Sequence, residues 1–376
     1  MVFVLVLLTF GCMKLRFSLR EHRAEKQNPS TNPAYYYYNC LTYKEQLLFD
    51  VLASSAEQFR MSSDSLPYRF TEEEFTRVVT ALRADAPQLF YVDFAAVTLK
   101  NAYHSAYLEL SYRIDASELD DKKAALAQAV AAVLEEAPSE NAGNQLPLYL
   151  HDTLTDLCSH ASEADSPFRK TAYGALVEGN ADSEGYAQAY LLLLKTSGVQ
   201  ALTVYGTADG QSHAWNMVAD DGAFAHVDVS WDDADLDFAP DMHFHGYYRL
   251  SDADIAQTHT ANWSESLPRA EEKETENYYQ MYDLCVSDEA SLEEILYREL
   301  FSAGFSQRPY VELYLDMEIG PQDDLLKPYH ETMLRVLSRT NELQEDFELL
   351  PVYRAYPVSG DAHAMTIQIF YQDKGV

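Results

Sequence analysis

The chain has 376 residues, of which 47% are hydrophobic, so it can bury a sizeable core in about two or three domains. Its formal net charge is −33 at pH 7, and a surface this acidic repels a phosphate backbone, which excludes nucleic acid as an expected partner. Cationic peptides, amines or metal ions are more compatible partners, although solubility is the simplest explanation of the charge. The four cysteines are scattered without a CxxC pair, which indicates neither a disulfide framework nor a zinc cluster.

Residues 1–30 combine a short apolar run, residues 2–13, with basic residues and the start of a polar linker. The run is too short to span a bilayer, because a spanning helix needs about 20 apolar residues. Its basic residues follow the run, whereas a signal peptide begins with them. We interpret residues 1–30 as a truncated export signal or, around Cys12, a lipoprotein anchor. Both interpretations predict an extracytoplasmic or membrane-anchored protein whose only membrane contact is this leader; a cytoplasmic protein is the alternative.

Residues 31–115 are predicted to form a small α+β domain. Helices are expected over residues 41–59 and 71–84, the second opened by a capping box of Thr71 and Glu74. Strands are expected over residues 89–94 and 105–114, where apolar and polar residues alternate in the second. The four consecutive tyrosines at residues 35–38 are interpreted as a strand or as a segment that docks on the core.

Residues 116–275 are predicted to form a central core that begins with helices over residues 117–136 and 146–159. The second helix contains His151, for which packing between helices is preferred over a role as an extra catalytic base. Cys158 in the same helix is expected to be a buried structural thiol.

The segment from residue 179 to residue 231 predicts one helix followed by three strands. The helix is expected to begin at Ser183, where apolar residues take up helical spacing, and to end before Gly198, which suits a left-handed cap. The strands are expected over residues 200–206, 213–219 and 224–230, which are rich in Val, Tyr, Trp and Phe.

The turn between the last two strands decides which side chains meet. An even-numbered turn would place His213 directly opposite Asp228, about 5 Å apart at Cβ, which suits an imidazole–carboxylate hydrogen bond. A three-residue turn with a glycine bulge would move Asp228 to the other face. With Ser183 at a helix N-terminus, the first register predicts a nucleophile, a base and an orienting carboxylate.

Three ordered motifs in this segment resemble the core of bacterial transglutaminase-like domains, which are relatives of papain-type cysteine peptidases. They are Ser183-Glu184-Gly185-Tyr186-Ala187, His213-Ala214-Trp215-Asn216 and Asp228-Val229-Ser230-Trp231-Asp232-Asp233. The resemblance covers at least residues 146–259 and implies an α+β fold, a papain-like core of helix plus antiparallel sheet, here flanked by two small α+β domains. The family pattern has cysteine where this chain has Ser183.

The resemblance implies a role for each matching residue. Ser183 would attack, His213 would act as base and then acid, and Asp228 would orient the imidazole. The backbone N–H groups of Ser183 and Glu184 would hold the oxyanion, because a helix start leaves such groups free. The expected substrate-binding residues are Trp215 and Trp231 as cleft walls, with Tyr173, Gly185 and Tyr186.

The hydroxyl of Ser183 weakens the expectation of catalysis. A helix N-terminus and an imidazole lower the pKa of a thiol enough to populate thiolate, but a hydroxyl is a far weaker acid. The sequence therefore predicts a degenerate triad in a catalytically impaired module of the cell envelope that binds a peptide or amide. The alternative is an active acyl-transfer enzyme or amide hydrolase that uses Ser183, as serine hydrolases do. A purely structural surface protein is the third class; no cofactor is predicted.

A carboxylate-rich run follows the third motif and leads to a His-x-His pair. Oxygen-rich runs can hold calcium and a His-x-His pair can hold a transition metal. The run lacks the glycine and the distal glutamate of an EF-hand, so we expect a solvated acidic loop and no metal site. The residues concerned are Asp232, Asp233, Asp235, Asp237, Asp241, His243 and His245.

Residues 276–376 are predicted to form a second small α+β domain, with a ferredoxin-like arrangement as one candidate. Helices are expected over residues 292–301 and 323–339, the latter starting late or kinked because it contains Pro328. Strands are expected over residues 310–317, 347–355 and 365–371. Nothing in this region suggests chemistry, so a binding or packing accessory is expected. The sequence predicts no oligomeric state.

Overall fold

The computed structural model describes residues 18, 20, 22–24, 26–138, 143–161, 166–220, 222–233, 243–262, 266–271, 275–306, 310–321, 324–342, 347–358 and 361–373. Helices and mostly antiparallel strands make up an α+β protein, as the sequence predicts. The chain forms two compact units. The first comprises Met1–Leu150, His160–Val204 and Trp263–Ser266, and the second comprises His151–Ser159, Tyr205–Asn262 and Leu267–Val376. The three-domain division stays a prediction.

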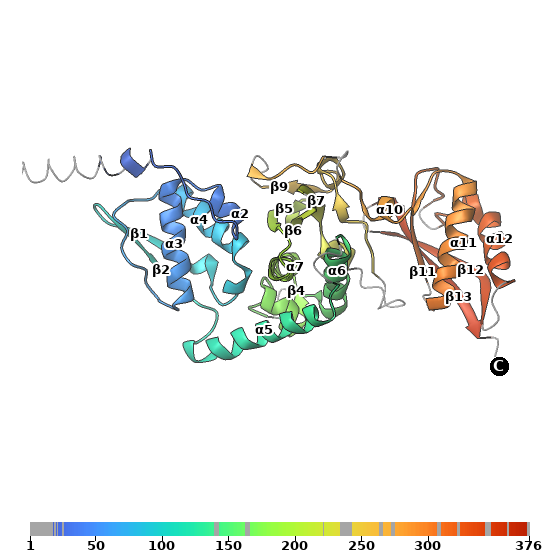
Figure 1. Ribbon diagram of the computed structural model, residues 1–376, viewed down its shortest axis with the longest axis horizontal. Helices are drawn as coiled ribbons and strands as arrows, with labels where there is room; N and C mark the ends of the chain where they lie inside the picture. Colours follow the sequence, from blue (N-terminus) through green and yellow to red (C-terminus); the bar gives the residue numbers. More distant parts are fainter. Residues whose placement is uncertain are drawn as a thin grey trace, which may run out of the picture. The chain divides into compact units, whose positions relative to one another are not determined.

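The first unit opens with short helices whose ends the sequence marks clearly. Helices α3 (Tyr43–Glu57) and α4 (Glu72–Asp85) pack together (Figure 1), and each begins with a capping box, at Thr42 and at Thr71. In each box the threonine side chain accepts the N–H group three residues on, while a glutamate accepts the N–H group of the threonine. The expected helix over residues 71–84 is therefore confirmed together with its cap.

The strands expected in this unit are shorter than predicted or absent. Residues 89–94 do not form a strand; two 3₁₀ turns, η1 (Pro87–Leu89) and η2 (Phe94–Ala96), occupy this region, with Pro87 in the first turn of η1. A short apolar run does not distinguish a strand from other buried structure, which explains the error. Of residues 105–114 only β2 (Ala106–Glu109) is a strand, and it pairs with β1 (Thr98–Asn101).

The tyrosine run docks on the core through its backbone. It forms the helical turn α2 (Tyr36–Asn39), in which Tyr37 and Tyr38 are buried. The carboxylate of Asp85, at the end of α4, accepts N–H bonds from Tyr36 at 3.0 Å, Tyr37 at 3.1 Å and Tyr38 at 2.8 Å. Burial raises the pKa of Asp85 to about 6, while the three N–H groups and Lys195 act in the opposite direction.

Replacement of Asp85 by alanine is expected to lower the free energy of unfolding by about 2–4 kcal/mol, because three N–H groups, two of them from buried residues, lose their acceptor. Chemical denaturation of the full chain measures this loss. Asp85→Asn keeps one acceptor oxygen and is expected to cost less. Asp120→Ala, at an exposed position in the first turn of α5, is the matched control and is expected to stay within about 0.5 kcal/mol of wild type. Equal losses for Asp85→Ala and the control would contradict the assignment.

The rest of the first unit contains longer helices and a short pair of strands. Helix α5 (Leu119–Glu135) follows the 3₁₀ turn η3 (Ala116–Glu118), and α6 (Gln145–Leu157) begins in this unit and ends in the second. A π-helical turn, η4 (Gly174–Glu178), precedes the short strand β4 (Asn180–Ala181), which pairs with β3 (Ser159–His160). Helix α7 (Ser183–Thr196) ends before Gly198, whose φ of +78° is the left-handed conformation expected of a C-terminal cap.

The largest sheet among the described residues has five strands, in the order β8-β7-β6-β5-β9. Its strands are β5 (Ala201–Ala208), β6 (Gln211–Asp220), β7 (Ala223–Val227), β8 (Tyr248–Leu250) and β9 (His259–Ala261). Asp220 pairs with Ala223, so β6 and β7 are joined by two residues, and Gly222 has a φ of +89° that glycine adopts without strain. The predicted register, with His213 directly opposite Asp228, is wrong by two residues.

The C-terminal part of the second unit is a four-stranded sheet in the order β10-β11-β13-β12. Two helices, α11 (Glu289–Ser306) and α12 (His330–Asn341), lie side by side against the sheet (Figure 1). The strands are β10 (Cys285–Val286), β11 (Tyr310–Leu315), β12 (Phe347–Val358) and β13 (Asp361–Asp373). The chain order β-α-β-α-β-β differs from the β-α-β-β-α-β order of a ferredoxin-like fold, so that candidate is wrong. Helix α12 starts late, after the turn η6 (Lys327–Tyr329), as Pro328 predicts.

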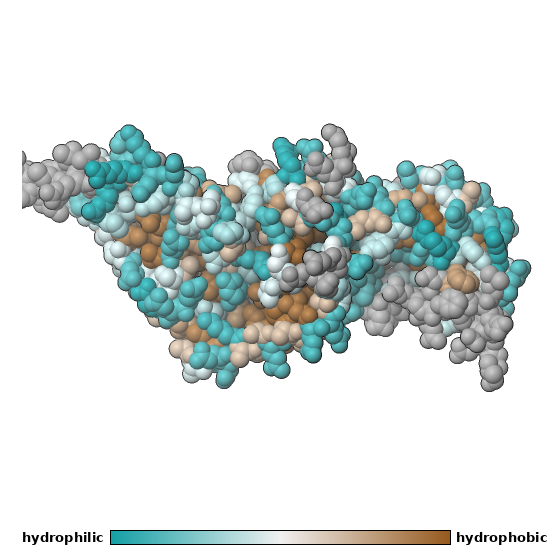
Figure 2. All heavy atoms as spheres, viewed as in Figure 1, coloured by the Kyte–Doolittle hydropathy of each residue, from teal (hydrophilic) through white to brown (hydrophobic). Residues whose placement is uncertain are grey.

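On the face drawn in Figure 2, hydrophilic side chains cover much of the surface and hydrophobic ones show between them. Among the described residues no helix is long and apolar enough to cross a membrane. Cys158 is buried, as expected, whereas Cys40 and Cys285 are exposed free thiols. The apolar run of residues 2–13, with Cys12, lies outside the described residues, so the predicted leader is not tested.

Candidate functional site

Ser183 is the first residue of α7, in the first unit, where the sequence places it. The residue before it, Asp182, is the N-cap, and its Oδ1 accepts the N–H groups of Glu184 at 3.1 Å and Gly185 at 3.3 Å. The half-buried Ser183 side chain is therefore not needed as the cap. Because the Glu184 N–H group already has an acceptor, its use as an oxyanion donor stays a prediction that requires Asp182 to release it.

Residues 184–186 hold the start of α7 in place by packing. The buried carboxylate of Glu184 accepts two hydrogen bonds from the Arg83 guanidinium, one from Nε and one from Nη2. A Cβ atom on Gly185 would lie 2.3 Å from the carbonyl oxygen of Arg169, so only glycine allows this close approach. Tyr186 is 1% exposed. Burial favours a packing role, rather than the predicted substrate contact, for Gly185 and Tyr186.

His213 and Asp228 meet in the second unit, although the register differs from the prediction. Asn216 pairs with Val227, and continuing this register would place Asp228 opposite Trp215 rather than opposite His213. A shift of two residues keeps a side chain on the same face of a sheet, so Asp228 is diagonal to His213. His213 Nε2 lies 2.5 Å from Asp228 Oδ2. This pairing leaves Nδ1 as the ring nitrogen that can face a nucleophile.

Asp228 does not extend the strand but begins a helical turn, α8 (Val229–Asp232). Its Oδ1 accepts the N–H groups of Ser230 at 3.1 Å and Trp231 at 3.2 Å and the Ser230 hydroxyl at 2.7 Å. Burial opposes ionisation of Asp228, but the neighbouring His213 and His259 rings outweigh it and hold the pKa of the carboxyl below its usual range. Asp228 is thus a fixed anion that orients His213.

His259, at the start of β9, is a second histidine on Asp228 that sequence reasoning did not select. Its Nε2 lies 3.0 Å from Asp228 Oδ2, and its Nδ1 lies 2.7 Å from the Thr258 hydroxyl oxygen. His259 lies 31 residues beyond Asp228 in the chain and carries no local motif of its own. Only its place on the strand next to β5 brings it to the carboxylate.

The two predicted tryptophan walls differ in exposure. Trp215 is 1% exposed and its Nε1–H donates to His226 Nδ1 at 3.0 Å, while His226 Nε2 lies 3.1 Å from Asp252 Oδ1. The Trp215 and His213 rings have centroids 6.3 Å apart, and the burial of Trp215 favours packing over the predicted cleft wall. The half-buried Trp231 ring lies edge-on to His213, with centroids 5.6 Å apart, and stays a candidate substrate contact.

Tyr173, also predicted to line the cleft, lies in an aromatic cluster of the first unit. Its ring stacks on Phe90 with centroids 4.8 Å apart, and Lys122 Nζ lies 4.9 Å from the centroid of its ring. Tyr173 is buried, which favours packing over substrate contact.

Ser183 belongs to the first unit, whereas His213, Asp228 and His259 belong to the second. The structure brings the imidazole and its carboxylate together, and the pairing of His213 with Ser183 stays a prediction.

A second polar cluster lies in the second unit around His151 and His245. His151 is fully buried, as expected, but its ring nitrogens face the carboxylates of Asp152 and Asp232. Asp232 is also buried, which corrects the prediction that it lies in a solvated loop; its Oδ1 accepts the N–H group of Tyr247 at 2.9 Å. Asp235, Asp237 and Asp241 lie outside the described residues.

Residues 116–229 match the family model of the transglutaminase-like superfamily. This stretch, which contains Ser183, His213 and Asp228, is therefore a transglutaminase-like domain, as the three motifs predict. No curated protein matches the chain.

Similar solved structures include one reported as a TGase, with 11% identity, 44% of this chain covered and a TM-score of 0.27. A second, from Cytophaga hutchinsonii and assigned as a cysteine protease, has 11% identity, 36% of this chain covered and a TM-score of 0.25. A third, menin, described with its binding site for the Mixed Lineage Leukemia protein, has 15% identity, 61% of this chain covered and a TM-score of 0.26. The chain spans 50%, 61% and 48% of the lengths of these structures, in the same order.

Proposed function

We propose that the chain is a catalytically impaired transglutaminase-like protein whose site binds a peptide or another amide-containing ligand. The observation that carries the proposal is the residue at the start of α7. The half-buried Ser183 occupies the nucleophile position of the motif, and its side chain is released from capping by Asp182. The hydroxyl cannot be ionised by a helix N-terminus and an imidazole, as a thiol can.

The retained pair of His213 and Asp228 supports a binding role for the site. An imidazole held by a buried carboxylate presents a ring nitrogen of defined orientation, which can hydrogen-bond an amide. Trp231 adds a half-buried aromatic surface beside this imidazole. Together these groups combine a few oriented polar atoms with apolar area, which is the usual composition of a ligand site.

The second candidate function is acyl transfer or amide hydrolysis, and the intact imidazole–carboxylate pair favours it. In this reaction Ser183 Oγ bonds to the carbonyl carbon of an amide while His213 takes the hydroxyl proton. His213 then returns that proton to the departing amine, and the acyl group remains on Ser183. Water or a second amine then bonds to the acyl carbon and gives a proton to His213, which passes it to Ser183 Oγ as the ester bond breaks and the acid or the new amide leaves. Asp228 keeps the imidazole in position through both steps.

We also propose a place at the cell envelope, where peptides and wall-derived amides occur. The support for this place is the apolar run of residues 2–13 with the basic residues that follow it.

Labelling with a serine-directed phosphonate separates the two candidates. An impaired site is expected to give no adduct on Ser183 under conditions that fully label a serine hydrolase, as measured by mass spectrometry of the intact chain and its peptides. An adduct that disappears in both Ser183→Ala and His213→Ala would overturn the impaired function and establish the serine enzyme.

Ligand binding is tested on the same protein with a panel of labelled cationic and neutral peptides, read by fluorescence anisotropy. Trp231→Ala is expected to weaken binding of a peptide that wild type binds, by about tenfold for the loss of one aromatic contact. Absence of binding across the panel, together with absence of labelling, would favour the purely structural protein.

A further inference from the structure

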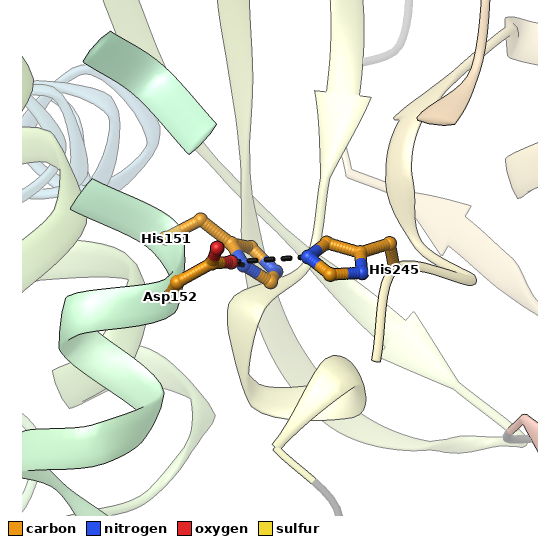
Figure 3. A group of neighbouring side chains, drawn as sticks. All are labelled: His151, Asp152 and His245. Carbon is orange, nitrogen blue, oxygen red and sulfur yellow. Dashed lines mark hydrogen bonds and ion pairs between the residues drawn. The ribbon is translucent and has the colours of Figure 1, made fainter. Parts of the chain in front are cut away.

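Three side chains in the second unit point their ligand atoms at one place (Figure 3). His151 and Asp152 extend from α6, and His245 extends from the segment that precedes β8. His151 Nδ1 lies 2.9 Å and His245 Nε2 lies 3.1 Å from the same atom, Asp152 Oδ1. The ligand atoms of the three residues all lie within 4.8 Å of one another. None of these residues takes part in the proposed function.

We propose that His151, Asp152 and His245 bind a divalent transition metal ion of the Zn²⁺ class, with water or His243 in the remaining position. Two imidazole nitrogens and one carboxylate oxygen are a typical donor set for Zn²⁺. With bonds of about 2.1 Å, the ligand atoms of a tetrahedral site lie about 3.4 Å apart. The two observed separations, 2.9 and 3.1 Å, are about 0.5 and 0.3 Å shorter than that value. His243 Nδ1 lies 3.9 Å from Asp152 Oδ2.

The outer nitrogens of both histidines support a metal. His151 Nε2 lies 3.2 Å from Asp232 Oδ2, and His245 Nδ1 lies 2.7 Å from Glu312 Oε2. A metal-binding histidine usually donates its second N–H to a carboxylate, which selects the tautomer whose other nitrogen carries a lone pair. Here both histidines have this partner, and in each the opposite nitrogen is the one that faces Asp152.

Contacts with Tyr278 and Glu312 fix the position of His245. The Tyr278 ring stacks on His245 with centroids 3.8 Å apart and an angle of 9° between the ring planes. Glu312 Oε1 accepts the backbone N–H group of His245 at 2.8 Å and the Tyr279 hydroxyl at 2.7 Å. The Asp152 side chain is 28% exposed, so an ion can reach the cluster from solvent. When the ligands of a site are already oriented, metal binding carries only a small free-energy cost for ordering them.

The cluster of His213, Asp228 and His259 offers the same kinds of donor atom and is the natural comparison. Its outer nitrogens lack carboxylate partners among the contacts of the described residues: His259 Nδ1 faces the Thr258 hydroxyl. Asp228 is also committed to the N–H groups of its own helical turn. The first cluster is therefore the metal site that the contacts favour, and His213→Gln provides a matched control.

The test is titration of the chelator-treated full chain with ZnCl₂ by calorimetry, in a buffer that contains excess Mg²⁺ to suppress weak binding to the acidic surface. We expect one Zn²⁺ per chain and a raised Tm on binding. His245→Gln is expected to weaken affinity by at least about 100-fold, and Asp232→Asn, whose contact with the cluster is through the outer nitrogen of His151, by about 10–100-fold. His213→Gln is expected to bind as wild type does.

Two outcomes would overturn the proposal. One is the absence of a stoichiometric site in wild type, with only several weak equivalents that Mg²⁺ displaces. The other is a site that His213→Gln abolishes while His245→Gln and Asp152→Asn leave it intact. Circular dichroism checks that each variant folds. If His245→Gln does not fold, Asp152→Asn and Asp232→Asn decide the outcome. The visible spectrum of Co²⁺ bound to wild type gives a second measurement. A spectrum of four-coordinate Co²⁺ with nitrogen and oxygen ligands supports the site, and an octahedral aquo-type spectrum contradicts it.

Discussion

Ser183→Cys is expected to create a thiol that reacts with iodoacetamide about tenfold faster at pH 6 than an ordinary cysteine. A thiol with a pKa of about 8.5 is about 0.3% ionised at pH 6, whereas a helix N-terminus and an imidazole bring that pKa to about 6 or below. The resulting gain in thiolate is roughly 100-fold, and the lower nucleophilicity of the more acidic thiolate removes about a factor of ten. The rate is measured at residue 183 by mass spectrometry across pH 5 to 9, a range set about the thiol pKa.

Two other cysteines of the chain serve as internal controls for this reaction. Cys40 and Cys285 are exposed residues, but partial burial of each thiol group raises its pKa. Nearby acidic groups raise both pKa values further, so these thiols react slowly at pH 6. Combining Ser183→Cys with His213→Ala is expected to remove most of the rate gain and to move the pH profile towards that of an ordinary thiol, because only the helix N-terminus then lowers the pKa. A slow thiol in Ser183→Cys itself would mean that His213 does not reach residue 183, and the proposed site would then be wrong.

Asp228→Ala is expected to lower the free energy of unfolding by about 3–5 kcal/mol. The change leaves the imidazoles of His213 and His259 without their shared carboxylate and removes the acceptor of two N–H groups in α8. Denaturant unfolding of the full chain measures the loss. Asp228→Asn keeps one acceptor oxygen for the turn and is expected to cost less. Asp316→Ala, at an exposed position, is the control and should change stability little.

The stabilisation by Asp228 is also expected to depend on pH, in a direction that its pKa determines. The folded protein holds the pKa of Asp228 below that of the unfolded chain, so the unfolded state takes up this proton first on acidification. The contribution is complete above the unfolded value of about 3.9 and is lost as pH falls towards the folded value. The difference in unfolding free energy between wild type and Asp228→Asn should therefore shrink below about pH 4. A difference that stays constant down to about pH 3 would contradict this prediction.

Local patterns predicted the features that depend on neighbours in sequence. The capping box at Thr71, the start of α7 at Ser183 and its end at Gly198 all follow from groups within one helical turn. Residues 89–94 were predicted wrongly because a short apolar run has no periodicity that separates a strand from 3₁₀ turns. The register of β6 and β7 was wrong by two residues because a two-residue turn can sit at more than one place in the Asp-Asp-Gly sequence, and moving it by one residue shifts the pairing by two.

The pairing of His213 with Asp228 was predicted for one of the two turn types considered. It survives the error in register because a shift of two residues keeps a side chain on the same face of a sheet. The contact of His259 could not be predicted, since no local pattern distinguishes a histidine that reaches a carboxylate from one that does not. The same holds for Glu312, which meets His245 from 67 positions further along the chain. Their contacts depend on strand order and on the packing of distant segments.

The sequence by itself determined the transglutaminase-like domain, the helix that begins at Ser183 and the motifs that contain His213 and Asp228. Hydrogen bonds within a turn and the two-residue period of a strand act over short separations, so the local order of residues is enough to specify them. Only the tertiary structure decided that Trp215 is buried, that His259 shares Asp228, and that His151, Asp152 and His245 converge. Burial and convergence depend on which distant segments pack together, and many segments of equal hydrophobicity compete for that role.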